Sequence, residues 1–333
     1  MHKSHFKNYN CWINGNTIRF ANMTNQRLIP EFINSLTRLI YKFEHKRIIL
    51  DFEEVNTVFP LPIVPIISYI DFFKTKEHID FEFINLSGYL KHINVFNPNS
   101  AEKLIENNNS KCLDKIWSFD NSDHVHVLSS FIIRDIRRTI ICEEGTLDAC
   151  RWGTNEIMDN VIQHSDIKRG FIMAQIQKSN KSVNICIFDY GIGIYKSLKG
   201  TENNPKNAID AIMLSVKEGV TRDKQIGQGN GLWGLFNMVA QNDGHLSIIC
   251  LHNPITVCIF APYFNEIYKL FTLFKESWLI IYEGFNRVPL FILPLIISRI
   301  PPVIFTLLEC DCVVFFYLSH TKQKKQTSLF EFV

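Results

Sequence analysis

Hydrophobic positions in the first third of the chain alternate between helical and strand spacing. Apolar residues keep helical spacing over 27–43, and a second apolar helix is predicted over 63–73, with three prolines crowding its first turn. Short apolar runs predict three strands: Thr17–Phe20, Arg47–Phe52 and Phe81–Leu86. Strands that alternate with helices predict a small α/β domain with parallel strand pairs, and we assign it to residues 11–105.

A polar stretch separates this domain from a second one. The run Asn107–Ser110 is typical of a loop, so residues 106–120 are expected to be a linker. Between residues 121 and 262, helical patterns cover 125–141, 146–164, 205–217 and 231–242. Strand patterns cover 170–177, 182–188, 245–251 and 255–260. Helix-rich stretches beside a mostly antiparallel sheet predict the α+β class.

The last segment, residues 263–333, differs in composition. It is apolar but broken by prolines, and its longest uncharged runs are shorter than the roughly 18 residues of a membrane span. Lys322, Lys324 and Lys325 follow the apolar stretch, which leaves membrane contact by this tail as an alternative. We expect a C-terminal tail of unknown role.

Charge and cysteine content narrow the function classes. The chain holds 35 Lys+Arg and 33 Asp+Glu, so its net charge of +2 disfavours nucleic-acid binding through bulk charge. The nine cysteines are scattered without a CxxC pair, and the N-terminus is too polar for a signal peptide. These features predict a reduced, cytoplasmic compartment and no nucleic-acid partner.

The first candidate motif lies on the predicted helix 146–164. Glu156, Asn160 and His164 are spaced four residues apart, so they share one helix face. An asparagine oxygen suits Mg²⁺, which keeps most of its waters and takes phosphate oxygens. A carboxylate one turn away could orient or deprotonate an attacking group. The alternative is a solvated amphipathic face without chemistry.

The second motif follows the strand 182–188. Asp189 ends this apolar strand, and Gly191 and Gly193 alternate with apolar residues after it. A buried aspartate could accept a hydrogen bond from an amino group such as adenine N6, and glycines let the backbone approach a flat ligand. The alternative is that these residues only form the turn that ends an ordinary strand.

The third motif opens the helix 231–242. Gly227, Gly229, Gly231 and Leu232 form a G-x-G-x-G-L pattern in a chain that has only 15 glycines. Backbone N–H groups of a glycine loop and a helix N-terminus form an anion site. No Gly-Lys-Ser/Thr follows and no strand directly precedes the pattern, which excludes a Walker A loop and a dinucleotide fingerprint.

Together and in this order, the three motifs resemble the N, G1 and G2 boxes of the GHKL family of ATP-binding domains, over residues 146–262. The resemblance implies a Bergerat-type sandwich of helices on a mixed, mostly antiparallel sheet that binds ATP and Mg²⁺. Asn160 would then be the Mg²⁺ ligand, Glu156 the general base and Asp189 the partner of the adenine amino group.

The resemblance also implies roles for the glycines and the residues between them. Gly191 and Gly193 would shape the pocket wall and the hinge of a lid over 194–226. Gly227, Gly229 and Gly231, followed by Leu232, would close over the triphosphate. Thr256 resembles a family threonine near the adenine. Thr221, Arg222 and Lys224 would lie near phosphate.

The length of this unit resembles anti-sigma-factor serine kinases more than other GHKL proteins. His124 and His126 lack the acidic neighbour that follows a phospho-accepting histidine. The order of elements in 11–105 weakly resembles a STAS domain, the fold of anti-sigma-factor antagonists. Thr57 and Ser68 flank the turn where such a domain is phosphorylated, and neither fits it well, so we expect the phosphoswitch to be lost.

The function expected from these features is ATP-dependent regulation. The chain would bind Mg²⁺-ATP and either phosphorylate a protein or hydrolyse ATP slowly, with a protein partner as regulator or substrate. The alternative is a non-catalytic switch, in which ATP orders the lid and thereby changes the binding of a protein partner.

Overall fold

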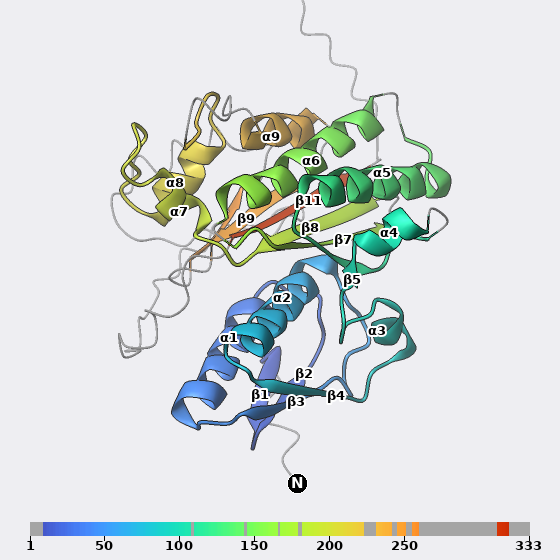
Figure 1. The fold of residues 1–333 in the computed structure, drawn as a ribbon, viewed down its shortest axis with the longest axis vertical. Coiled ribbons are helices and arrows are strands. Elements are labelled where there is room, and N and C mark those ends of the chain that lie inside the picture. The colour runs from blue at the N-terminus through green and yellow to red at the C-terminus, as the bar shows by residue number, and fades with distance from the viewer. Residues whose placement is uncertain are drawn as a thin grey trace, which may run out of the picture.

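The computed structural model describes residues 9–107, 110–142, 145–165, 167–178, 182–222, 231–241, 245–250, 255–259 and 312–319. These residues form an α+β fold with two sheets and helices in separate layers (Figure 1). The α+β class expected from the sequence is therefore confirmed.

The smaller sheet belongs to the N-terminal part of the chain. Its strands are β1 (Cys11–Asn14), β2 (Thr17–Phe20), β3 (Arg47–Asp51) and β4 (Asp80–Ile84), in that spatial order. β1 and β2 form an antiparallel hairpin, whereas β2, β3 and β4 are parallel. The helical connections α1 (Leu28–Thr37), extended by a π-helical turn at Arg38–Lys42, and α2 (Pro60–Lys76) make the parallel pairing possible. The predicted parallel pairs are present, and β1 is an additional strand.

Within the part of the chain that the structure describes, the larger sheet has seven strands and is mixed but mostly antiparallel. In spatial order they are β10 (Ile255–Ile259), β9 (His245–Cys250), β11 (Cys312–Ser319), β8 (Ser182–Asp189), β7 (Gly170–Gln177), β6 (Ile116–Phe119) and β5 (Asn99–Ser100). Only the edge pair β5–β6 is parallel. The two predicted antiparallel pairs, β7–β8 and β9–β10, are both present.

Three strands of this sheet come from outside the segment 121–262. β5 lies within the segment 11–105 that the sequence assigned to the N-terminal domain, yet it pairs with β6 of the larger sheet. The expected linker 106–120 contains β6, whose Trp117 and Phe119 are buried in the core together with Cys112 and Leu113. A four-residue strand behind a polar run shows too little alternation to be recognised from sequence. The expected tail contributes β11, which lies between β8 and β9; the rest of 263–333 lies outside the described residues.

One face of the larger sheet is covered by a helical layer of α5 (Ser122–Thr139), α6 (Thr146–His164) and α9 (Gly231–Gln241) (Figure 1). The Asn121 side chain caps α5 by accepting a hydrogen bond from the His124 N–H at 2.9 Å. The short helix α4 (Glu102–Glu106) adds Leu104 to the same core. The candidate residues on α6 and α9 therefore belong to this helical layer.

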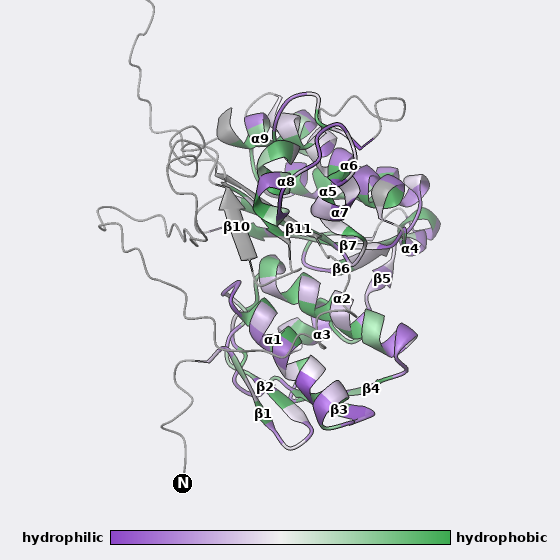
Figure 2. Ribbon diagram, turned by 90° about the vertical axis from the view of Figure 1, so that its left-hand side faces the viewer, coloured by the Kyte–Doolittle hydropathy of each residue, from purple (hydrophilic) through white to green (hydrophobic). Residues whose placement is uncertain are grey.

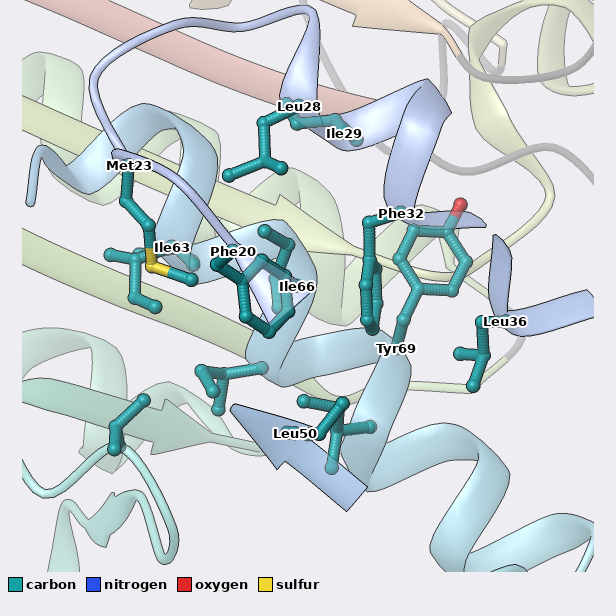
Figure 3. Close-up of a cluster of buried hydrophobic side chains, with 14 of the residues drawn as sticks. Phe20, Met23, Leu28, Ile29, Phe32, Leu36, Leu50, Ile63, Ile66 and Tyr69 are labelled. Atoms are coloured by element: carbon teal, nitrogen blue, oxygen red, sulfur yellow. The ribbon is translucent and has the colours of Figure 1, made fainter. Parts of the chain in front are cut away.

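The opposite face of the larger sheet is covered by α2, which also lies against the smaller sheet (Figure 1). Its side chains are buried on most sides, as expected for a helix that is apolar all round (Figure 2). Ile63, Ile66 and Tyr69 of α2 gather with Phe20 and Phe32 (Figure 3). The N-terminal part and the larger sheet therefore share one continuous hydrophobic core.

Three further helices complete the described structure: α3 (Gly88–His92), α7 (Gly193–Leu198) and α8 (Ala208–Ser215). Every predicted helix is present, although α2 begins at Pro60 instead of residue 63. The short helices α4 and α7 were not expected from the sequence. Among the described helices, none combines the length and apolarity that a bilayer crossing requires.

Candidate nucleotide site

Helix α6 presents Glu156 and Asn160 at the edge of the core. Ile157, Met158 and Val161 are buried against the sheet and fix the rotation of the helix. Glu156 and Asn160 are half-buried, so they are neither fully solvated nor sealed in the core. The structure thus supports the predicted shared face for these two residues; the side chain of His164 lies outside the described part.

Glycines in α6 and α9 make room for side chains of the other helix. A Cβ added at Gly153 of α6 would stand 2.8 Å from Cδ1 of Leu235, and one at Gly234 of α9 would collide with the ring of Trp152. Because neither glycine has a side chain, the Leu235 side chain packs on the backbone of α6 and the Trp152 ring packs on the backbone of α9.

The start of α9 lies beside the candidate residues of α6. A Cβ added at Gly231 would be 2.8 Å from Oε2 of Glu156 and 3.5 Å from Nδ2 of Asn160. The structure therefore brings the first and third sequence motifs together. Leu232 is partly buried against the core, while Gly227, Gly229 and Lys224 lie outside the described residues.

The carboxyl groups near Gly231 hold their protons more tightly than usual. Burial raises the pKa of Glu156, and the nearby charge of Asp159 raises it further. Burial also raises the pKa of Asp159, whereas His126 of α5 lowers it. A carboxylate with a raised pKa is a stronger base, which suits proton abstraction near neutral pH.

Asp189 ends β8 as a buried carboxyl group. It is 9% exposed, and burial raises its pKa from 3.8 to about 7, although the Gly191 N–H lowers it by donating to Oδ1 at 2.8 Å. Ile185 and Ile187 face the helical layer. Since side chains alternate along a strand, Asp189 faces the same side.

Gly191 links this carboxyl to α6. A Cβ at Gly191 would stand 2.5 Å from Cβ of Ser165, the residue that caps the end of α6, and 2.8 Å from Oδ1 of Asp189. Gly193 opens α7 with a φ of 67°, in the left-handed region that favours glycine. Both glycines thus have structural reasons to be glycine, and the second motif joins the first through Ser165.

The segment expected to form the lid is partly anchored. Ile212 of α8 and Val216 after it are buried in the main core, and Leu198 of α7 is also buried. Asn203 donates from Nδ2 to the Thr221 carbonyl oxygen at 3.2 Å, and Arg222 is exposed. A lid movement that included α8 would therefore break its buried contacts, so any cheaper movement would leave α8 in place.

Several sequence candidates lie away from the site or in less accessible places. Thr256 is in β10 opposite Ile249, and its side chain is outside the described part. His124 is buried and lies 3.0 Å from Oδ1 of Asp120, whereas His126 is exposed. Ser68 is fully buried in α2 and donates to the Val64 carbonyl oxygen at 2.8 Å, so it is closed to a kinase.

Sequence reasoning missed two residues that adjoin the site. Ser165 contacts Gly191, and no motif spacing indicates it. Asn155 directly precedes Glu156, and among the described residues no donor reaches its buried Oδ1. A polar residue next to a candidate carboxylate is the one feature that could have drawn attention to Asn155.

The described site offers one half-buried carboxylate and one amide beside the start of α9, and a buried carboxyl group at the end of β8. Within the described ranges, no group of three or more His, Cys, Asp or Glu side chains could hold a metal ion by itself. A metal here would need most of its ligands from a bound molecule or water. No protein-family model and no curated protein sequence matches this chain.

Proposed function

We propose that the chain is a regulatory protein that binds Mg²⁺-ATP in a GHKL-like nucleotide site. The observation that carries this proposal is the meeting of Gly231 with Glu156 and Asn160 at the start of α9. A helix N-terminus attracts phosphate because its free N–H groups and dipole favour negative charge. Glu156 and Asn160 would face whatever binds there.

The amide of Asn160 fits the metal that accompanies a nucleotide. Mg²⁺ prefers oxygen ligands and usually takes one or two from the protein, with phosphate and water oxygens supplying the others. Asn160 would therefore hold the ion, which would neutralise phosphate charge.

Asp189 would determine which nucleotide base the site prefers. Its carboxyl group is buried at the end of β8 on the side of the helical layer, and its Oδ1 accepts the Gly191 N–H. A carboxylate accepts a hydrogen bond from the adenine amino group, whereas guanine presents a carbonyl oxygen at that position. A buried polar group left without its partner is costly, so the site would favour adenine.

Glu156 would make the site an enzyme of phosphoryl transfer. Its raised pKa suits a general base that orients a protein hydroxyl or a water molecule toward the terminal phosphate. Positioning and electrostatic stabilisation supply most of the catalysis in such reactions. Protein phosphorylation and slow ATP hydrolysis are the two outcomes, and a switch without turnover is the competing function.

The N-terminal α/β part would serve as a STAS-like sensor or docking unit for a protein partner. Its four-stranded sheet with helices α1 and α2 agrees with that proposal at the level of architecture. Ser68 is buried, so regulation would work through binding and not through phosphorylation of this serine.

Hydrogen exchange with and without Mg²⁺-ATP tests the proposal. Binding should slow amide exchange in residues 156–164, 189–193 and the first turn of α9, because bound ligand stabilises the folded state locally. The strands β1 and β4 serve as the internal control and should change least. Unchanged exchange in all three segments, at saturating Mg²⁺-ATP, would contradict the proposed function.

A further inference from the structure

Helix α2 contacts the larger sheet on the face opposite the candidate nucleotide site. The Tyr69 ring lies 5.5 Å from the Phe188 ring, and the Phe72 ring meets the Tyr190 ring edge-on at 5.4 Å. These aromatic pairs follow β8 to the point where Asp189 ends it. The C-terminal half of α2 therefore lies directly behind the residues proposed to bind adenine.

One polar side chain of α2 ties two separate segments together there. Oδ2 of Asp71 lies 3.2 Å from Nε of Arg169, and Nη2 of Arg169 donates to Oδ1 at 3.3 Å. The Tyr190 hydroxyl donates to Oδ2 of the same carboxylate at 3.5 Å. The Asp71 side chain is only 19% exposed, so water screens this contact less than it screens a surface ion pair.

The two segments held by Asp71 flank the strand pair that carries Asp189. In the β7–β8 register Gly170 lies opposite Asp189. Arg169 directly precedes Gly170, and Tyr190 directly follows Asp189. Asp71 thus contacts the residue before Gly170 and the residue after Asp189, from the face of the sheet opposite the candidate site.

We propose that Asp71 is a positioning residue for the nucleotide site, through which the N-terminal part sets the affinity and selectivity for adenine. This inference rests on the proposed function. Consecutive side chains on a strand point to opposite faces. Asp71 holds Tyr190 and Arg169 on one face of the sheet. This contact therefore fixes the backbone of Asp189 and Gly191, which would contact the ligand on the opposite face.

The same contact gives a partner a route to the site. A ligand or protein that shifts α2 would alter the Asp71 contacts and, through them, the placement of Asp189. Coupling of this kind is reciprocal, so adenine nucleotide would change the affinity of the N-terminal part for its partner by the same factor.

The test measures ATP and GTP affinity in the full chain for wild type, Asp71→Asn and Arg169→Gln. Both variants should weaken Mg²⁺-ATP binding by about tenfold while leaving Mg²⁺-GTP almost unchanged, so the preference for ATP falls. Asp80→Asn is the matched control, because Asp80 pairs at 3.8 Å with Arg47 on the exposed side of the smaller sheet. It should keep the wild-type preference.

The double variant Asp71→Asn/Arg169→Gln separates positioning from general destabilisation. It should lose no more ATP preference than either single change, because both remove the same contact. Asp71→Glu keeps the charge and should restore part of the preference. A purely structural role would instead lower the unfolding temperature and leave the ATP-to-GTP ratio intact, which would overturn the inference.

The outcomes for the two proposals differ. Wild type that binds Mg²⁺-ATP, together with Asp71→Asn of unchanged affinity and selectivity, refutes the role of Asp71 and leaves the proposed function standing. Wild type that binds no nucleotide refutes both. Should Asp71→Asn fail to fold, Tyr190→Phe decides, because it removes the hydroxyl group that contacts Asp71 and keeps the ring. An unchanged ATP preference in that variant counts against the inference.

Discussion

A methyl group on Gly231 would lie 2.8 Å from Oε2 of Glu156, a separation that real carbon atoms essentially never show. No side chain therefore fits between the glycine at the start of α9 and the carboxylate on α6 without a shift of one of them. The glycine-mediated packing of α6 on α9 produces this close approach, and the proposed phosphate site depends on it.

Gly231→Ala should impair turnover while leaving the fold intact. The new methyl group would meet the far end of a flexible side chain, so Glu156 can swing away at little cost in stability. A displaced base costs up to about 100-fold in rate. Single-turnover ATP consumption and the unfolding temperature check this prediction.

Gly234→Ala is the contrasting control for that experiment. Its methyl group would collide with the Trp152 ring, so it should lower the unfolding temperature by forcing α6 and α9 apart. Normal turnover in Gly231→Ala would show that the Glu156 carboxylate is not used.

Glu156→Gln decides between an enzyme and a switch. A general base touches the reacting group, so its loss should lower turnover by about 10²–10⁴-fold and leave Mg²⁺-ATP affinity nearly unchanged. Asp159→Asn, which alters a neighbouring carboxylate, is the control. If wild type consumes ATP and Glu156→Gln consumes it equally fast, the assigned role is wrong; if wild type shows no turnover with any partner, the switch function is favoured.

Asp189 should make stability depend on pH in the absence of nucleotide. Burial raises its pKa from 3.8 to about 7, so the folded state binds this proton more tightly than the unfolded state does. The resulting stabilisation is complete below about pH 4 and disappears as the pH rises through about 7. Asp189→Asn cannot titrate, and denaturant unfolding should show a smaller decrease in its unfolding free energy over that range. Identical pH profiles of wild type and Asp189→Asn would show that a group other than Asp189 causes the pH dependence.

Asp189 should also discriminate between bases. Competition against a fluorescent ATP analogue should show ATP displacing the probe at far lower concentration than GTP, because guanine offers no amino hydrogen at the matching position. Asp189→Asn should reduce that difference. Equal competition by GTP in wild type would mean that Asp189 does not contact the base.

Long periodic segments of the fold could be predicted from the sequence. The helix 146–164 was expected with the bounds that α6 has, because its apolar residues recur at helical spacing. The strands β1 and β6 have four residues each and stand in polar surroundings, so alternation alone could not identify them. β11 could not be assigned because its partners, β8 and β9, are distant in sequence.

The site was predictable as separate motifs and not as an arrangement. Spacing indicated that Glu156 and Asn160 share a helix face, and the glycine pattern indicated a helix start at residue 231. Their meeting depends on Gly153 and Gly234, whose importance appears only when α6 and α9 are packed together. The contacts of Asp71 with Arg169 and Tyr190 join residues far apart in the chain, and no local pattern encodes them.

Calorimetric titration of Mg²⁺-ATP into the full chain tests the central claim most directly. Wild type should bind saturably, Asn160→Ala should lose most of that affinity while keeping its unfolding temperature, and Gln163→Ala, an exposed change on the same helix, should bind like wild type. Absence of binding to wild type, or equal affinity of wild type and Asn160→Ala, would contradict the account.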